Sequence, residues 1–254
     1  MSENQSHAGN QLYDDKFYRA QKDDSFISAK IVLPIVEKVV HPRNVIDIGC
    51  GVGTWLAAWK NLFGVKIYGV DGDYVDRSQL FIDEKDFYPL NLEKRGGVSD
   101  LFVDKKFDLV ESLEVAEHLS PERADSFVED LTKLGDIILF SAAIIGQTGT
   151  NHVNEQMQSY WAKKFLSLGY VGIDCIRSKI WNYQQVVTCY RQNTFLYVNS
   201  KELYRYPELH KFYLENGDNI IYDIVHPENW INRLMYFQNT VQQFNAYLEQ
   251  IQKK

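Results

Sequence analysis

Short runs of β-branched and aliphatic residues alternate with helix-like segments over most of the chain. The segments 55–63, 121–134 and 160–168 repeat apolar residues at spacings of three and four, which is typical of helices that pack on a sheet. The apolar runs that predict strands are residues 44–48, 65–70, 107–112, 136–141, 170–176 and 194–199. This alternation predicts an α/β domain with a mainly parallel sheet and helices on both faces.

The two ends of the chain differ from this pattern. Residues 1–12 are polar and we expect them to be disordered, and residues 13–40 are mostly helical and predict a lid in front of a domain that ends near residue 200. Residues 201–254 predict a C-terminal helical appendage. Its apolar positions alternate by three and four, as in a coiled-coil heptad: Leu234, Phe237, Val241, Phe244, Leu248 and Ile251. The simplest interpretation is a helix packed on its own domain; the alternatives are a homodimer seam or a docking helix for another enzyme, such as a glycosyltransferase.

Composition narrows the class of partner. The chain has 254 residues, of which 45% are hydrophobic and 24% charged, and its net charge is −7. Nucleic-acid-binding domains usually carry a basic excess, so the charge argues against duplex nucleic acid, although a short RNA end stays open. The three cysteines form no CxxC pair, the first residues contain no apolar signal sequence, and no apolar run is long enough to span a bilayer. We therefore expect a reduced, soluble, cytoplasmic protein.

A glycine-rich turn follows the first predicted strand. Asp47 lies in that strand, and glycines follow at positions 49, 51 and 53 before a helix begins. Open α/β sheets bind ligands at this edge, and glycines let the backbone approach a ligand closely. A dinucleotide-binding loop needs a glycine at its sixth position, which is Thr54 here. The spacing therefore indicates a ligand other than NAD.

This stretch resembles the first motif of the class I S-adenosylmethionine-dependent methyltransferases. The resemblance implies a Rossmann-like fold with a seven-stranded sheet and S-adenosylmethionine as cofactor. Asp47 would meet the cofactor's ammonium group, Asp71 the ribose hydroxyls, and Asn91, where an Asp is usual, the adenine amino group. The full set of predicted cofactor-binding residues is Tyr18, Gln21, Asp47, Gly49, Cys50, Gly51, Asp71, Gly72, Asn91, Leu92 and Ser112.

Acidic and histidine side chains gather after the third predicted strand. Glu114, Glu117 and His118 follow it, and His152 lies in the loop 146–156 after the next strand. Neighbouring parallel strands place these two loops side by side. Carboxylates and imidazoles together suit Mg²⁺, Mn²⁺ or Fe²⁺.

The Glu-x-x-Glu-His spacing resembles the metal-binding element of small-RNA terminal 2′-O-methyltransferases and of ubiquinone-pathway O-methyltransferases. That resemblance implies Glu114, Glu117, His118 and His152 as ligands of Mg²⁺ or Mn²⁺. Many class I enzymes carry Glu-His here without a metal, the Glu shaping the loop. In that case His118 or His152 is the natural general base, and the catalytic residues are His118, His152 and Glu117.

The residues from His152 to Gln156, followed by Tyr160 and Trp161, resemble methyltransferases of bacterial surface-polysaccharide pathways. This resemblance implies O-methylation of a small polar acceptor, a nucleotide-linked or polysaccharide sugar. The alternatives are an RNA-end 2′-O-methyltransferase, which the net charge disfavours, and a non-catalytic cofactor-binding scaffold that recruits a glycosyltransferase. An NAD oxidoreductase is opposed by the glycine spacing.

Overall fold

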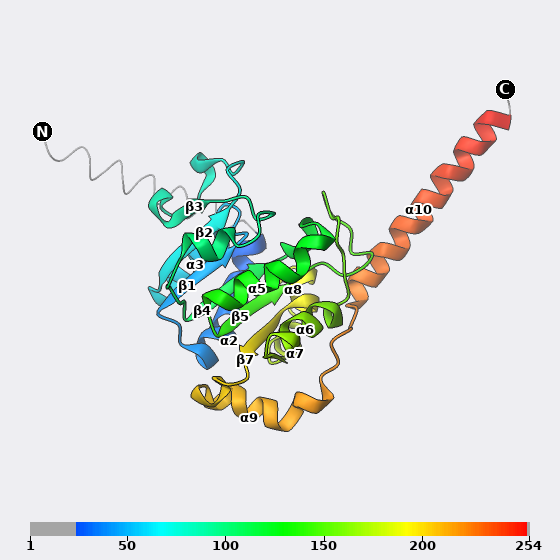
Figure 1. The fold of residues 1–254 in the computed structure, drawn as a ribbon. Coiled ribbons are helices and arrows are strands. Elements are labelled where there is room, and N and C mark those ends of the chain that lie inside the picture. The colour runs from blue at the N-terminus through cyan, green and yellow to red at the C-terminus, as the bar shows by residue number, and fades with distance from the viewer. Residues whose placement is uncertain (1–23, 253–254) are drawn as a thin grey trace, which may run out of the picture.

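A computed structural model describes residues 24–252 and contains one seven-stranded sheet (Figure 1). The strand order is β3-β2-β1-β4-β5-β7-β6. Pairing is parallel from β3 to β5, whereas β7 runs antiparallel to both β5 and β6. The strands are β1 Asn44–Ile48, β2 Lys66–Asp71, β3 Phe87–Pro89, β4 Leu109–Leu113, β5 Ile137–Ser141, β6 Tyr170–Ile173 and β7 Phe195–Asn199. The predicted mainly parallel, seven-stranded α/β fold is confirmed.

Helices cover both faces of the sheet. Their bounds are α2 Asp24–Val40, α3 Thr54–Phe63, α4 Gly97–Leu101, α5 Ala124–Leu134, α6 Gln158–Ser167, α7 Arg177–Ile180, α8 Thr188–Asn193, α9 Pro207–Asn216 and α10 Pro227–Gln252. Helix α5 is preceded by a short 3₁₀ turn, Pro121–Arg123. Ser120 does not cap it, because its hydroxyl donates to the Glu93 carboxylate instead.

Two hydrophobic cores form because successive strand residues point to opposite faces of the sheet. Val45 of β1 packs with α2, α3 and α7 on one face, whereas Ile46, the next residue, packs with α4, α5 and α6 on the other. A mainly parallel sheet is buried on both faces, and for that reason its strands are continuous apolar runs. The carboxyl ends of β1, β2 and β4 are left to carry polar groups at one edge.

The described part of the predicted lid is a core helix. Ala29, Val32, Leu33 and Val36 of α2 are fully buried, and α2 packs along α3. The predicted disordered lead 1–12, and Tyr18 and Gln21 with it, lie outside the described residues.

Helix α10 projects away from the rest of the molecule (Figure 1). The six heptad side chains named above are 40–63% exposed. The expectation that this helix packs on its own domain is therefore wrong, because its apolar stripe lies in solvent. Among the described helices, α10 included, none combines the length and apolarity needed to cross a bilayer.

Candidate active site

The loop between β1 and α3 is built from glycines in a left-handed conformation. Gly49, Gly51 and Gly53 have φ values of +92°, +54° and +80°. A Cβ atom at Gly49 would lie 2.3 Å from a methyl carbon of Val115, and one at Gly53 would lie 2.8 Å from Ile82. The predicted close approach of backbone at this turn is therefore present, and side chains are excluded at two of its three glycines.

Asp71 ends β2 beside this loop. Its carboxylate accepts hydrogen bonds from the backbone N–H of Gly51 at 2.7 Å and of Gly72 at 2.6 Å, and from the Tyr74 hydroxyl at 2.6 Å. Burial and this bond to Asp71 raise the pKa of Tyr74 to about 12. Asp71 thus stands at the edge of the turn as a carboxylate that already binds a hydroxyl group, which is the role predicted for it toward a ribose. Tyr74 was not predicted, because nothing in its local sequence marks it.

A cavity of about 1030 Å³ opens over the ends of β1, β2 and β4. Its walls combine the glycine loop, the end of β2, the segment after β3, and the loops after β4 and β5. The residues that line it are Gly49, Gly51, Asp71, Gly72, Asp73, Tyr74, Pro89, Leu90, Asn91, Leu92, Glu93, Glu114, Val115, His118, Leu119, Thr150 and Asn151. Six of the predicted cofactor-binding residues are among them: Gly49, Gly51, Asp71, Gly72, Asn91 and Leu92.

Three other predicted cofactor-binding residues are not among those that line the cavity. Asp47, Cys50 and Ser112 are buried and do not line it. The Ser112 hydroxyl has no hydrogen-bond partner among the described residues, and burial raises the pKa of the Cys50 thiol well above its usual range.

Two carboxyl groups are buried together under the glycine loop. Asp47 of β1 and Glu111 of β4 are register partners on adjacent strands and are 4% and 0% exposed. Glu111 Oε1 accepts from Trp59 Nε1 at 2.7 Å, whereas its Oε2 finds no partner in the described structure. Burial, and then the charge of Asp71, raise the pKa of Asp47 to about 8. A buried acid pair of this kind favours a positively charged ligand group at the turn above it, and the ammonium group of S-adenosylmethionine fits that requirement.

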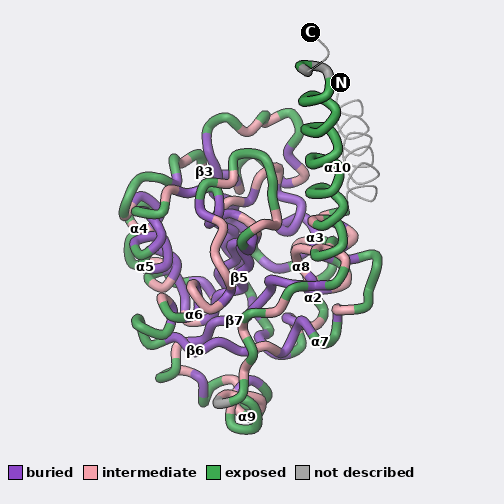
Figure 2. The backbone as a smooth tube through the Cα atoms, turned by 90° about the vertical axis from the view of Figure 1, so that its right-hand side faces the viewer, coloured by how far each residue is buried: buried purple, intermediate pink, exposed green. Residues whose placement is uncertain are grey.

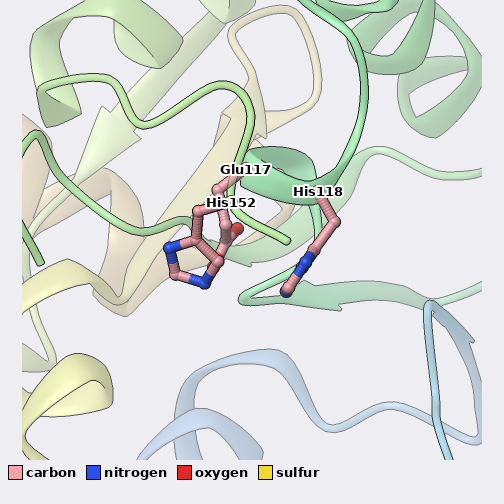
Figure 3. Close-up of side chains that lie close together, drawn as sticks. All are labelled: Glu117, His118 and His152. Atoms are coloured by element: carbon pink, nitrogen blue, oxygen red, sulfur yellow. The ribbon is translucent and has the colours of Figure 1, made fainter. Parts of the chain in front are cut away.

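Three of the four predicted metal-ligating residues come together after β4 and β5. One ligand atom each from Glu117, His118 and His152 lies within 4.8 Å of the others (Figure 3). Glu117 and His118 belong to a short 3₁₀ turn after β4, Ala116–His118, and the imidazole rings of His118 and His152 meet edge to face at 4.8 Å. The predicted juxtaposition of the two loops is confirmed.

The Glu117 carboxylate is 0% exposed, and neither of its oxygens has a hydrogen-bond partner in the described structure. Burial, and then the charge of Glu114, raise the pKa of Glu117 to about 9. His152 Nδ1 lies 2.8 Å from Glu155 Oε1, which leaves Nε2 for a ligand. An unpaired buried carboxylate beside two imidazoles, one of them oriented by a second carboxylate, fits the donor set of a divalent metal.

Glu114 does not join this cluster. Its carboxylate accepts from Gln147 Nε2 at 2.7 Å and from Asn193 Nδ2 at 3.2 Å. Its backbone has a φ of +56°, a left-handed conformation that is uncommon for a residue with a side chain and recurs at functional sites. The structure thus gives Glu114 a different role from the predicted one: it ties the loop after β5 to α8.

Comparisons with known proteins agree with this geometry. Residues 18–141, just under half of the chain, match the family described as "Methyltransferase domain". These residues are therefore similar to a methyltransferase domain. The prediction of a methyltransferase, made from the glycine loop and the acids at the strand ends, is confirmed; nothing in the match concerns surface polysaccharides.

Two further proteins are similar to this chain, one in sequence and one in fold. A rice protein (Oryza sativa subsp. japonica) named "Probable tocopherol O-methyltransferase, chloroplastic" is 29% identical over 96 residues, 37% of this chain and 26% of its own length. The chain therefore spans about a quarter of that relative. The methyltransferase solved with the Haloferax volcanii Trm112 methyltransferase activator has a TM-score of 0.50 and 15% identity, over 74% of this chain and 96% of that one. This second likeness shows a shared fold.

Proposed function

We propose that this protein is an S-adenosylmethionine-dependent O-methyltransferase that acts on a hydroxyl of a small polar acceptor with the help of a divalent metal. The observation that carries the proposal is that one cavity reaches from the glycine loop and Asp71 to His118 and Asn151. Its volume of about 1030 Å³ has room for a cofactor and an acceptor together. The relative named as a tocopherol O-methyltransferase supports oxygen as the methylated atom.

The residues of the chain position the cofactor and supply the charges that bind it. The glycine loop admits the donor, Asp71 accepts hydrogen bonds from its ribose, and the buried pair Asp47 and Glu111 faces its ammonium group. S-adenosylmethionine supplies an electrophilic methyl group, and transfer requires the acceptor oxygen to approach it in line with the C–S bond. Catalysis of such a displacement comes mainly from holding the two reactants in that geometry.

Glu117, His118 and His152 would hold a divalent ion, and such an ion would supply Lewis acidity that lowers the pKa of an acceptor hydroxyl. The Glu155 carboxylate fixes the orientation of the His152 ring. If the site works without a metal, His118, which lines the cavity, is the group placed to take the acceptor's proton, because burial and His152 lower its pKa and keep it neutral.

We further propose that the acceptor is a sugar, nucleotide-linked or part of a polysaccharide. Thr150 and Asn151, which precede His152 in the chain, line the cavity with polar side chains. Such groups suit a polyhydroxylated acceptor better than an apolar one. An RNA end is the second candidate, which the Glu-x-x-Glu-His spacing favours and the net charge of −7 disfavours.

The test is labelled methyl transfer from S-adenosylmethionine to nucleotide-linked sugars, oligosaccharides, short RNA ends and catechols, with and without a chelator. We expect transfer to a sugar that stops with chelator and returns with Mg²⁺ or Mn²⁺. Glu117→Gln should lose this activity at least about 100-fold while binding of S-adenosylhomocysteine persists, and Glu122→Gln, an exposed neighbour, should behave as wild type. Methyl transfer at the same rate with and without chelator would contradict the proposed role of a metal. Methyl transfer to RNA alone would contradict the proposed sugar acceptor.

A further inference from the structure

Helix α10 exposes a row of large apolar side chains to solvent. Residues 230–249 are exposed, apart from the half-buried Arg233, and the tube of α10 has the colour of exposed residues along most of its length (Figure 2). Isolated helices are marginally stable in water, and most gain their stability by burying an apolar face. No other segment of the described residues 24–252 covers the apolar stripe of α10, so the stripe needs a partner.

Seven apolar side chains form one continuous stripe on α10, which we call the seam. They are Trp230, Leu234, Phe237, Val241, Phe244, Leu248 and Ile251, exposed by 40–63%. Their spacing of four, three, four, three, four and three keeps the seam on one side of the helix when two helices supercoil. The helix has 26 residues and so extends about 39 Å. The seam matches another helix of similar length better than a groove, which takes anchors over two or three turns.

The first turn of α10 is fastened to α8, so the seam is held in a defined direction. Glu228 forms an ion pair with the buried Arg191 and accepts a hydrogen bond from Thr188 at 3.0 Å. Asn229 donates to Gln192 at 3.1 Å. These contacts make α10 a built extension of the domain.

The charges of α10 favour an identical partner. No Asp, Glu, Lys or Arg occurs between Leu234 and Leu248. The positions that flank the seam there, Gln238, Thr240, Asn245 and Tyr247, are uncharged, so two copies meet no like charges. At roughly 100 Å² for each exposed seam side chain, two copies would bury on the order of 1,400 Å², which is in the range of stable interfaces.

We propose that α10 is a dimerisation helix and that two copies of this chain pair their seams as a two-stranded coiled coil. The partner is the chain itself, and this inference stands apart from the acceptor and the metal of the active site. The dimer leaves the cavity of each copy unchanged, because the seam lies beyond the residues that line it.

The test compares solution masses of full-length variants by sedimentation equilibrium and light scattering. The seam variant combines Phe237→Glu and Phe244→Glu. The matched control combines Asn239→Glu and Ala246→Glu, which add the same two charges at the same spacing of seven residues but on the opposite side of α10. We expect wild type and the matched control at twice the 29.6 kDa chain mass. The seam variant should be a monomer, with its dissociation constant raised at least about 100-fold, and should still bind S-adenosylhomocysteine.

A gentler pair, Leu234→Ala with Leu248→Ala, adds no charge and should raise the dissociation constant at least about ten-fold. Wild type that stays monomeric at high micromolar concentration would overturn the proposal, and the seam would then belong to a different protein. A seam variant that is as dimeric as wild type would overturn it as well, because the contact would then lie elsewhere.

Discussion

Gly49 lies where the backbone of the cofactor loop passes within contact distance of Val115. The position combines a φ of +92° with a Cβ site 2.3 Å from a Val115 methyl carbon. Gly64 at the end of α3 also has a left-handed conformation, with a φ of +66°, but nothing lies within 4 Å of its Cβ site. A substitution by alanine at Gly64 therefore introduces only an unfavourable backbone conformation, whereas the same substitution at Gly49 introduces that conformation and a steric clash with Val115.

We predict that Gly49→Ala raises the dissociation constant for S-adenosylhomocysteine at least about ten-fold, because Val115 and the loop must move apart. Gly64→Ala should lower the free energy of unfolding by about 1 kcal/mol through its conformation alone and leave the affinity unchanged. Calorimetric titration and denaturant unfolding of both variants measure this. Equal affinities in the two variants would mean that the close approach at Gly49 has no part in binding.

Asp47 links cofactor binding to pH. Its pKa is raised from 3.8 to about 8 by burial and by Asp71, so the free protein holds a proton that the unfolded chain has lost. The stability of the free protein should therefore fall as the pH rises from about 4 to about 8. A cationic ammonium group at this site favours the carboxylate, so binding should release the proton.

We predict that the affinity for S-adenosylhomocysteine rises by up to about ten-fold from pH 6 to pH 7 and levels off above pH 8. Titrations in two buffers of different ionisation enthalpy count the proton released. In Asp47→Asn the dependence should flatten, because the titrating group is gone. A wild-type affinity that is constant from pH 6 to pH 8 contradicts this coupling.

The loop after β5 is the element that brings His152 to the site, and one carboxylate organises it. Glu155 accepts hydrogen bonds from the backbone N–H groups of Gly146 and Thr148, both at 2.7 Å, and meets His152 at 2.8 Å. The backbone N–H of Val153 in turn donates to the Glu117 carbonyl oxygen at 2.9 Å. Glu155 is thus a positioning residue for the histidine of this loop.

We predict that Glu155→Gln lowers kcat about 10- to 100-fold, because a neutral amide cannot replace all three contacts. The dissociation constant for S-adenosylhomocysteine should stay within about two-fold, since the cofactor loop lies on other elements. Steady-state kinetics with separate kcat and KM, beside titration, distinguish these effects, with Glu122→Gln as the matched control. A loss of cofactor affinity equal to the loss of kcat would place Glu155 in the donor site instead.

At the scale of helices and strands, the sequence predicts where most elements begin and end but not which surfaces they cover. Strand β1 was predicted at its observed bounds, because a β-branched run stopped by glycines has few alternatives. Strand β3 was not predicted as a strand, since three residues carry no periodicity. The segment 24–40 was expected in a lid, yet helical periodicity cannot say which surface a helix covers, and α2 lies in the core.

At the scale of the whole molecule, strand order decides which residues meet. The sequence places Glu114, Glu117, His118 and His152 at one sheet edge, and the structure joins three of them. Glu114 lies apart because Gln147 and Asn193, the latter 79 residues away, bind it. Glu111 was missed for the same reason: its partners Asp47 and Trp59 come from distant segments. Hydrogen-bond partners at such separations leave no local pattern.

Both the proposed reaction and its pH dependence require that S-adenosylmethionine binds in the cavity beside Asp71. The most direct test is calorimetric titration with S-adenosylhomocysteine and, separately, with NAD. Both titrations are made on the wild-type chain and on the Asp71→Asn variant. We predict one site for S-adenosylhomocysteine, no response to NAD, and at least about ten-fold weaker binding in Asp71→Asn, because the ribose hydroxyls lose a charged acceptor, with Asp104→Asn unchanged. Binding of NAD without S-adenosylhomocysteine, or full affinity in Asp71→Asn, would contradict the account.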